Sequence, residues 1–429
     1  MNPRARAGEH NSAWRWTFVP DLDAGHVRTC GSRRVHRTQG LRTASDHLSR
    51  TILEHVRIAV VTESFLPQVN GVTNSVLRVC DHLGARGHEV IVYAPGGPGC
   101  DETPDHYGSA QIVRGPSVGL PRYRDFRVGL PAPALGRMLR DWRPDIVHLA
   151  SPAAVGAHGA FLAQKMRIPA VAVYQTDLAG FASRYGLSSA DKVLWRWLRR
   201  IHATVGRTLA PSRHAVAELE RRGVKRVARW ARGVDLERFR PDRRDDELRQ
   251  RLAPEGELIV GYVGRLAHEK QVDLLTGLDR TPGIRLVMVG DGPQRASLQR
   301  KMPNARFLGF QSGTRLAEVF ASLDVFVHTG AHETFCQAAQ EALASGLPVV
   351  APRAGGLLDL VEEGRNGLLF TPGEARDLHL KVRQLGTDRQ QVLDFAAAAR
   401  PSVQGRTWSV IGDELLGHYE HVASGKEAA

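Results

Sequence analysis

Two glutamates flank the start of a predicted helix at a spacing that could bind a ligand. Glu333 and Glu341 are separated by seven residues of helix-forming composition. Thr334 and Gln337 match the Ser/Thr-x-x-Glu/Gln capping pattern, so we predict that Thr334 caps a helix that Gly346 ends. Glu333 should then stand just outside the helix, and Glu341 within it.

This spacing puts the two carboxylates roughly 12 Å apart along the axis, at about 1.5 Å per residue. The free amides of Phe335 and Cys336 should lie between them, at a helix N-terminus that can face a phosphate. One carboxylate could accept hydrogen bonds from sugar hydroxyls, and the other from ribose hydroxyls. Taken alone, however, two glutamates on a helix more often belong to a solvated face.

Cations follow one of the short apolar runs. Gly264 and Arg265 come directly after the run at residues 258–263, and Lys270 lies five residues beyond Arg265. Both cations could turn toward the same strand end and neutralise a diphosphate. A surface basic pair explains this pattern equally well when it stands alone. Glycine turns that would let the backbone approach a ligand follow two other runs, at residues 290–292 and 355–356.

The apolar runs alternate with helix-length amphipathic stretches, which is typical of βαβ units and parallel sheets. One series begins near residue 58 and another near residue 258, so we predict an α/β fold with two doubly wound halves. A polar, proline-started run at residues 241–247 suits a linker. Ligands of such sheets bind at the carboxyl ends of the strands, so the active site is expected between the halves. Strands are predicted at 58–61, 90–94, 146–149, 170–174, 258–263, 285–289, 325–328 and 347–351, and helices at 74–86 and 408–421.

Composition excludes several classes of protein. The 429 residues are 42% hydrophobic and 24% charged, which suits two or three domains with sizeable cores. The four cysteines form no CxxC pair, so we expect a reduced, cytosolic protein without a disulfide framework or a structural zinc site. The formal net charge of +13 favours anionic partners, although a general arginine bias explains much of it. No membrane-spanning helix is expected, because the longest uncharged window contains polar groups.

The first 55 residues are rich in arginine and histidine and show no sustained period. We predict that they are disordered, and they lack the apolar region of a secretory signal. They could form a basic arm that touches a membrane. Alternatively, they are a translated region upstream of the true start, in which case Val56 would be an initiator position.

Together these patterns resemble the retaining GT-B glycosyltransferases of family 4. The resemblance covers roughly residues 56–421, and it implies two facing Rossmann-like domains with an interdomain cleft. A basic leader at 1–55 would precede an acceptor domain at 56–240. A nucleotide-sugar donor domain at 241–405 would follow, and then a segment at 406–429 whose helix crosses back to the N-terminal domain. The motifs that carry the resemblance are Pro67-Gln68-Val69-Asn70-Gly71-Val72, Gly264-Arg265-Leu266 with Lys270, and Glu333-x7-Glu341 followed by Gly346-Leu347-Pro348-Val349-Val350.

The resemblance also implies roles for single residues. Arg265 and Lys270 would bind the donor diphosphate, Glu341 the ribose and Glu333 the transferred sugar. Many family members carry a sugar-binding histidine near residues 174–177, where this chain has Gln175, Thr176 and Asp177 instead. The catalytic candidates are therefore Arg265, Lys270, Glu333 and Asp177, and the donor-binding candidates are Gly71, Gly264, Arg265, Lys270, Phe335, Cys336 and Glu341.

No bound metal or other cofactor is expected, because no Asp-x-Asp cluster stands in a donor-facing context. Fixed cations and amides must then stabilise the leaving diphosphate, and Arg265 and Lys270 are assigned that task. The sequence displays no suitably placed carboxylate nucleophile. The resemblance implies front-side attack assisted by the leaving phosphate, without a covalent enzyme intermediate.

Within the family, residues 62–67, 174–177 and 308–313 look most like actinobacterial GDP-mannose-dependent α-mannosyltransferases. Plant-type sulfolipid synthases are more similar to this chain than sucrose or glycogen enzymes are. We therefore expect mannose transfer from GDP-mannose to a membrane glycolipid, such as one bearing a uronic acid or inositol phosphate. This would be a step of cell-envelope glycolipid biosynthesis on the inner face of the cell membrane.

Two segments could contact the acceptor or the bilayer. Residues 191–200 combine cations and tryptophans on a predicted helix that could lie on an anionic membrane surface. A core-packed helix with a solvated basic face explains them as well. Tyr123, Arg124 and Arg127 lie in a predicted loop that could meet an acidic head group. His148, at a strand end, is expected to be a core histidine rather than a catalytic group.

Three alternatives remain open. A glycolipid synthase of the same fold could use a UDP-sugar, because spacing does not determine which base is bound. A non-catalytic carbohydrate-binding relative is possible, although the four charged candidates are all present. The basic charge permits a nucleic-acid-binding protein, but no nucleic acid is expected, since helix-turn-helix and aromatic-basic patterns are absent. An oxidoreductase is excluded, because no Gly-x-Gly-x-x-Gly follows a strand.

Overall fold

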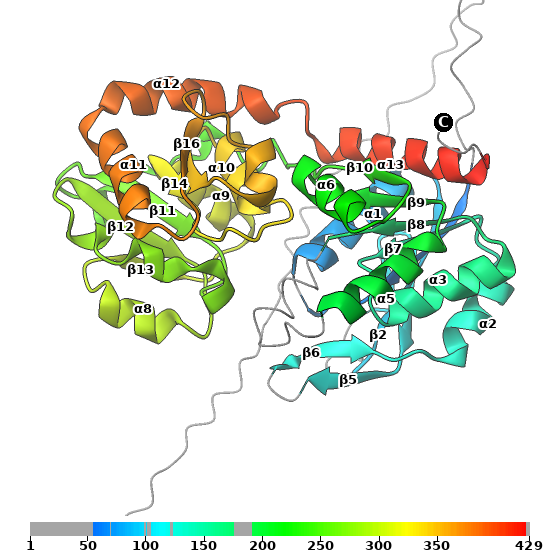
Figure 1. Cartoon of the computed structure of the whole chain (residues 1–429). Coiled ribbons are helices and arrows are strands. Elements are labelled where there is room, and N and C mark those ends of the chain that lie inside the picture. The colour runs from blue at the N-terminus through cyan, green and yellow to red at the C-terminus, as the bar shows by residue number, and fades with distance from the viewer. Residues whose placement is uncertain are drawn as a thin grey trace, which may run out of the picture. The chain divides into compact units, whose positions relative to one another are not determined.

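The computed structural model describes residues 55–68, 70–97, 100, 104–120, 123–175 and 191–425 (Figure 1). Residues 1–54 and the candidate Asp177 lie outside the described residues. The prediction of a disordered leader therefore stays a prediction. Two largely parallel sheets with flanking helices build most of the described part, and the expected α/β class is confirmed.

The first half of the chain forms an eight-stranded sheet with the order β10-β9-β8-β7-β1-β2-β4-β3. All of its strand pairs are parallel except β3 with β4. β5 and β6 pair with each other in a separate antiparallel hairpin. The strands are β1 (Arg57–Thr62), β2 (Glu89–Pro95), β3 (His106–Tyr107), β4 (Ala110–Gly115), β5 (Ser117–Leu120), β6 (Tyr123–Gly129), β7 (Ile146–Ala150), β8 (Ala170–Val173), β9 (Arg207–Ala210) and β10 (Val227–Arg229). The helices are α1 (Gly71–Ala85), α2 (Pro133–Trp142), α3 (Val155–Met166), α5 (Asp191–Ala203) and α6 (Arg213–Arg221).

The second half contains a six-stranded, wholly parallel sheet with the order β13-β12-β11-β14-β15-β16. Its strands are β11 (Leu258–Val263), β12 (Ile284–Val289), β13 (Arg306–Gly309), β14 (Val325–Val327), β15 (Val349–Pro352) and β16 (Gly367–Phe370). Its helices are α7 (Asp246–Leu252), α8 (Arg295–Lys301), α9 (Gly313–Ala321), α10 (Gln337–Ala344), α11 (Ala375–Thr387) and α12 (Arg389–Ala399), and short 3-10 turns connect several of these elements.

Both faces of each sheet are buried, which is why the strands read as continuous apolar runs. Along β1, side chains alternate between two cores. Ala59 and Val61 pack with residues of α2, α3 and α5, whereas Ile58 and Val60 pack with residues of α1 and of the last helix. The second sheet is likewise covered by one apolar cluster on each face.

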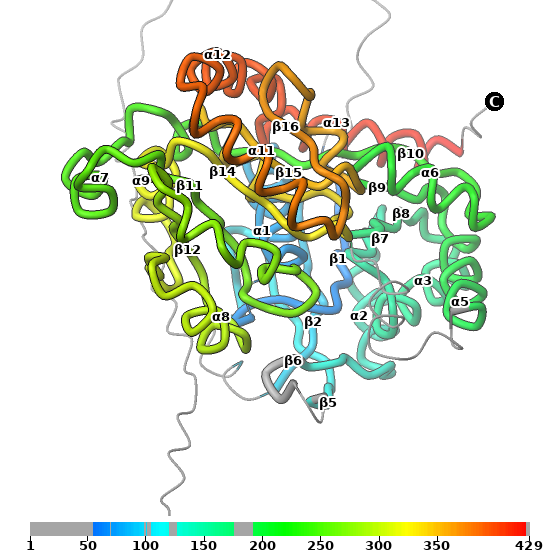
Figure 2. Tube along the Cα trace, turned by 60° about the vertical axis from the view of Figure 1, so that its left-hand side comes forward, coloured from blue at the N-terminus to red at the C-terminus, as the bar shows by residue number. Residues whose placement is uncertain are grey.

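The last helix, α13 (Trp408–Ala423), lies against the first half of the chain (red in Figures 1 and 2). Ile411, Leu415 and Tyr419 belong to the same core cluster as β1. Tyr419 donates or accepts a hydrogen bond at Nδ1 of His148, 2.8 Å away, and Trp230 donates to the carbonyl of Ile411. Burial lowers the pKa of His148 to about 3, so this residue is a neutral core histidine, as expected.

Two local expectations are wrong. The first helix begins at Gly71 rather than at residue 74, because Asn70 caps it by accepting hydrogen bonds from the amides of Val72 and Thr73. Residues 123–127, predicted as a loop, belong to strand β6. That hairpin lies outside the main sheet, and its strands lack apolar runs like those that identify β1 and β11.

Candidate functional site

Lys270 and Glu333 form an ion pair at the carboxyl end of the second sheet. Lys270 ends a short turn after β11, and Glu333 lies in the loop between β14 and α10. The Lys270 Nζ atom is 2.5 Å from Oε1 of Glu333, and Nε2 of His328 is 3.1 Å from the same oxygen. Because β11 and β14 are adjacent strands, the loops that follow them meet at one edge. One carboxylate oxygen is thus shared by two basic side chains.

In this cluster, charge interactions change the pKa values more than burial does. Burial opposes the charged form of each group, but Lys270 and His328 hold the pKa of Glu333 well below its usual range. Glu333 in turn raises the pKa of Lys270 despite the burial of the ammonium. Burial would lower the pKa of His328, yet Cys336 and Glu333 raise it to about 9. At neutral pH the cluster therefore carries an ionised carboxylate between two cations.

The helix after Glu333 begins later than predicted. Its first residue is Gln337, and its N-cap is Cys336 rather than Thr334. The hydroxyl of Thr334 is engaged elsewhere, because it donates to the backbone carbonyl of Gln175, 2.9 Å away. Cys336 has a φ of 84°, a left-handed conformation that is costly for a residue with a side chain. The capping-box prediction is therefore wrong, and Phe335 and Cys336 lie in the turn before the helix, with both side chains buried.

Glu341 lies within α10, as predicted, and is half-buried. Burial raises the pKa of Glu341 to about 7, although Gln337, Arg238 and Arg78 lower it. Arg78 belongs to α1 of the first half, and its guanidinium pairs with Asp235 at 3.4 Å. The pKa of Glu341 is thus near neutral pH and responds to charges from both halves.

The loop that carries Arg265 is built on close backbone packing. Arg265 follows β11 directly and is exposed. Gly290 and Gly292 follow the neighbouring strand β12 with φ values of 127° and 156°. A Cβ atom on Gly290 would collide with the carbonyl of Gly264, and one on Gly292 with the carbonyl of Leu266. These glycines therefore let two loops pack together, whereas the sequence suggested that they approach a ligand.

Gly355 and Gly356 support the Glu333 loop in the same way. The amide of Gly356 donates to the carbonyl of Glu333 at 2.8 Å. A Cβ atom on Gly355 would clash with the Glu333 backbone, and one on Gly356 would clash with the Phe335 backbone. Both glycines hold the loop that presents the carboxylate.

The candidate Gly71 begins α1 and is exposed, and a Cβ built on it meets no atom within 4 Å. Open space therefore lies beside this glycine. The residues before it have structural roles that the sequence did not reveal. Oε1 of Glu63 accepts hydrogen bonds from the amides of Ala153, Ala154 and Gly156 at 2.7 to 2.8 Å, so Glu63 stabilises the start of α3.

The acceptor candidates belong to the β5–β6 hairpin. Arg127 donates from Nε to the carbonyl of Gly96 at 3.0 Å and to Oγ of Ser117 at 2.7 Å. Its side chain therefore fastens the hairpin to the end of β2. Tyr123 and Arg124 lie on β6, and their side chains are outside the described part of the structure.

Helix α5 combines a buried face with a basic outer face. Trp195 is 4% exposed and buried, whereas Trp197 is 38% exposed and its indole donates to the carbonyl of Ala153 at 3.1 Å. Val193, in contrast, is 61% exposed. The outer face of the helix is therefore cationic, and contact of this face with a membrane stays a prediction. The exposed cations on this helix are Lys192, Arg196, Arg199 and Arg200.

Hydrogen bonds that the sequence did not predict join the two halves near the Glu333 loop. Besides Thr334 with Gln175, the Gln340 side chain donates to the carbonyl of Arg232 at 2.9 Å. Gln337 donates to the carbonyl of Gly233 at 3.1 Å. The side chain of Arg213 reaches Asp359 at 3.2 Å. No spacing pattern identified Arg232.

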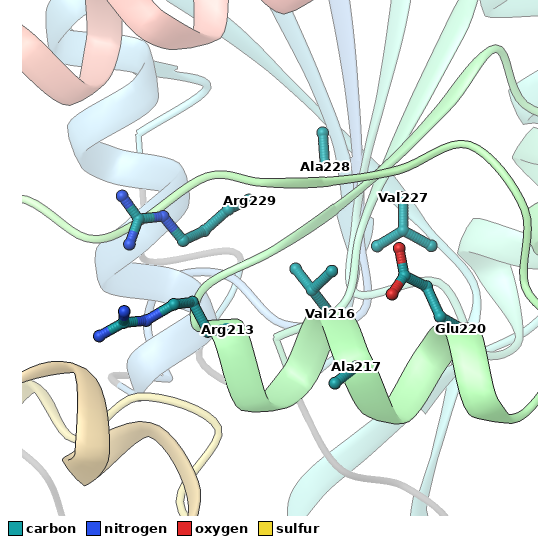
Figure 3. Close-up of a pocket in the computed structure, with 7 residues that line it drawn as sticks. All are labelled: Arg213, Val216, Ala217, Glu220, Val227, Ala228 and Arg229. Atoms are coloured by element: carbon teal, nitrogen blue, oxygen red, sulfur yellow. The ribbon is translucent and has the colours of Figure 1, made fainter. Parts of the chain in front are cut away.

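A pocket between α6 and β10 is lined by Arg213, Val216, Ala217, Glu220, Val227, Ala228 and Arg229 (Figure 3). Arg213 and Arg229 extend to the same side of the pocket, and both pair with Asp359 of the second half. None of the candidate site residues lines it. Its cations are already engaged by a carboxylate, so we interpret the pocket as part of the contact between the halves.

Within the described ranges, no three histidine, cysteine, aspartate or glutamate side chains are grouped so that they could hold a metal ion. No helix among those residues is long and apolar enough to cross a membrane.

Comparison with known proteins identifies relatives over most of the chain. The profile of Glycosyltransferase Family 4 matches residues 69–238, and that of Glycosyl transferases group 1 matches residues 243–401. A GDP-mannose-dependent alpha-mannosyltransferase of Mycobacterium tuberculosis is 52% identical over 86% of this chain and 97% of its own length. A sulfoquinovosyl transferase of Arabidopsis thaliana is 33% identical over 82% of this chain and 71% of its own.

Solved structures share the fold. The HepE protein of Anabaena in complex with UDP superposes with a TM-score of 0.71 at 20% identity, over 85% of this chain and all of that one. The expected GT-B architecture, with two Rossmann-like sheets, is therefore confirmed.

Proposed function

Because this chain belongs to glycosyltransferase family 4, we propose that it is a GDP-mannose-dependent α-mannosyltransferase that transfers mannose to a membrane glycolipid. The observation that carries this proposal is the 52% identity with such an enzyme over 97% of that enzyme's length. The sulfoquinovosyl transferase, whose name gives a different transferred sugar, is 33% identical.

In the proposed reaction, the leaving diphosphate of the donor binds Lys270 and Arg265. Lys270 suits this role because its raised pKa keeps the ammonium protonated at neutral pH, and a fixed cation stabilises charge that develops on the leaving group. Arg265 is exposed after β11, so its guanidinium can be engaged by a phosphate without breaking an ion pair between described residues.

Glu333 is proposed to bind hydroxyls of the transferred sugar. In the free protein, its Oε1 accepts from both Lys270 and His328. A phosphate that engages Lys270 would weaken the Lys270–Glu333 pair and free carboxylate lone pairs for the sugar. Donor binding and sugar recognition are thereby coupled through one ion pair.

The mycobacterial relative is named as an alpha-mannosyltransferase, and GDP-mannose is itself an α-glycoside. The proposed transfer therefore retains configuration. We propose front-side attack by the acceptor hydroxyl, in which a leaving-phosphate oxygen takes the hydroxyl proton, so that no covalent enzyme intermediate forms. Asp177 remains a catalytic candidate. Glu341 would bind the ribose, and Gly71 would approach the donor. Gly264, Phe335 and Cys336 would shape the donor-binding site.

The acceptor half is proposed to meet the bilayer through α5. Its exposed cations and the exposed Val193 suit an anionic lipid surface, with the protein peripheral on the inner face of the cell membrane. Replacing Lys192 and Arg196 with glutamine should then weaken binding to anionic vesicles. It should leave donor binding unchanged, because α5 carries no donor candidate.

The transferase assay offers the full-length protein GDP-mannose or UDP-glucose together with vesicles that contain a diacylglycerol glycoside. We expect lipid-linked mannose from GDP-mannose and little product from UDP-glucose. Transfer from UDP-glucose alone would contradict the donor assignment and favour the glycolipid synthase. Donor binding without transfer to any lipid would favour a non-catalytic binding protein.

A further inference from the structure

His328 is a buried histidine beside Glu333, and no motif of the sequence assigns it a role. It directly follows β14, and its Nε2 atom lies 3.1 Å from Oε1 of Glu333. The ammonium of Lys270 contacts the same oxygen. An ionised carboxylate can only accept hydrogen bonds, so Nε2 must carry a hydrogen and act as the donor. His328 therefore donates to the carboxylate that is proposed to bind the sugar.

The imidazole ring of His328 is held by buried neighbours. It stacks with Tyr262 of β11 and Phe326 of β14, at centroid distances of 6.2 and 6.4 Å. Both neighbours are fully buried, and the hydroxyl of Tyr262 donates to the carbonyl of Arg265 at 3.1 Å. The backbone amide of His328 donates to the carbonyl of Val350 on β15 at 2.9 Å. The N–H donor of the ring thus has a fixed position relative to the second sheet.

Lys270 and His328 share one carboxylate oxygen, but they differ in how easily a ligand can reach them. The Lys270 side chain is 29% exposed, whereas the His328 side chain is 4% exposed. The ammonium of lysine sits on a flexible four-carbon stem and can turn toward a phosphate. The stacked ring of His328 lacks this freedom. A donor can therefore draw Lys270 away from Glu333 while His328 keeps its contact.

The loop between β14 and Glu333 leaves room for this contact. A Cβ atom on Gly330 would lie 3.2 Å from Nε2 of His328 and 3.5 Å from Oε1 of Glu333, so a larger residue would press on the hydrogen bond. The hydroxyl of Thr329 donates to the carbonyl of Lys270 at 2.6 Å and fixes the backbone of the other basic residue. The loop is thus built around the shared carboxylate oxygen.

The charges around the ring favour its protonated form. Among the described residues, Glu333 and Cys336 act on His328 directly, Tyr262 stacks with it, and Lys270 lies across the shared oxygen. Burial would lower the pKa of His328, but Cys336 and Glu333 raise it to about 9. A protonated ring donates a charge-assisted hydrogen bond, which is stronger than one from a neutral ring.

We infer that His328 is a positioning residue for the donor sugar. It holds Oε1 of Glu333 while the donor phosphates engage Lys270, so that Oε2 of the same carboxylate meets a sugar hydroxyl. This inference rests on the proposed function and adds a residue that acts on the sugar through Glu333. Without His328, a carboxylate released by Lys270 would keep neither of these two partners and would lose its fixed orientation.

The test compares the affinities of GDP and GDP-mannose for the full-length protein by calorimetric titration. Both ligands carry the same base, ribose and diphosphate, so a change in the ratio of their dissociation constants between variants reports on the sugar. His328→Phe keeps a ring for stacking and removes the N–H donor. It should weaken GDP-mannose binding by about 10-fold, a usual loss for a hydrogen bond to a charged group, and leave GDP binding nearly unchanged.

Two further variants distinguish positioning from a structural role. His328→Gln keeps an N–H donor at a similar reach, so it should recover much of the sugar-dependent affinity. In a protein that already carries Glu333→Ala, His328→Phe should change the ratio no further, because the histidine acts through the carboxylate. A purely structural role would weaken both nucleotides alike and would not depend on Glu333.

His148→Phe is the matched control, because it replaces another buried histidine, which pairs with Tyr419 in the first half. It should lower the melting temperature and leave the ratio intact. An unchanged ratio in His328→Phe, or equal losses of GDP and GDP-mannose affinity, would overturn the inference and leave the proposed function standing. Absence of GDP binding by the unmodified protein would contradict the proposed function, and the inference with it.

Discussion

Nζ of Lys270 lies 2.5 Å from Oε1 of Glu333. The cation proposed to bind the donor diphosphate is therefore paired with the carboxylate proposed to bind the donor sugar. Neither side chain is free to act alone. A donor that draws Lys270 to its phosphates must also change the hydrogen bonding of Glu333, which remains held by His328. Loss of either partner should therefore affect catalysis more than folding.

Lys270→Ala should lower kcat/KM for mannose transfer by about 10²- to 10³-fold, because it removes a fixed cation from the leaving group. Lys270→Arg should retain part of the activity, since it keeps the charge. Steady-state kinetics at saturating acceptor measure the effect. Lys301→Ala is the control, because Lys301 is exposed at the end of α8. An unchanged kcat/KM in Lys270→Ala would contradict the proposed role.

Glu341 should make both stability and donor binding depend on pH. Its folded-state pKa, about 7, lies above the ordinary value of 4.5, so the folded state disfavours ionisation. Its contribution to stability is therefore complete below pH 4.5 and is lost as the pH rises toward 7. We expect Glu341→Gln to raise the melting temperature by about 1–3 °C at pH 8 and to leave it unchanged at pH 4.5.

The same group should bind ribose hydroxyls better as a carboxylate. GDP-mannose affinity should consequently increase between pH 6 and pH 8, and this increase should disappear in Glu341→Gln. Calorimetric titration measures it, and the donor diphosphate itself does not titrate in this range. An identical pH dependence in the variant would show that Glu341 does not contact the donor.

Two glycines should respond differently to the same substitution. Gly290→Ala should destabilise the fold by about 1–3 kcal/mol, because the new Cβ would strike the Gly264 carbonyl at a left-handed φ. Gly71→Ala should leave the melting temperature unchanged, since its Cβ meets open space, but should raise the KM for GDP-mannose. Gly405→Ala, which also meets open space, is the control. Normal donor kinetics in Gly71→Ala would remove Gly71 from the site.

Glu63→Ala should cost about 2–3 kcal/mol of unfolding free energy, because it leaves several amides at the start of α3 without their charged acceptor. Denaturant unfolding measures the loss. Glu89→Ala provides the comparison, since Glu89 is 69% exposed in its pair with Arg57 and should contribute about 0–1 kcal/mol. Equal effects of the two substitutions would refute the capping role of Glu63.

The sequence predicts those features that depend on local pattern. Strands such as β1 and β11 are buried on both faces, so their apolar runs identify them directly. Thr334 shows why a local signal fails, because its hydroxyl binds the carbonyl of Gln175, which is 159 residues away in the chain.

The most direct test of the central claim is thermal stabilisation by nucleotides. GDP-mannose, GDP, UDP-glucose and UDP are compared at equal concentration, since a ligand that binds only the folded state raises the melting temperature. We predict stabilisation by GDP-mannose and GDP, little by the UDP pair, and loss of the effect in Glu341→Ala. Stabilisation by the UDP pair alone would contradict the mannosyltransferase assignment, and no stabilisation by any of the four would contradict donor binding altogether.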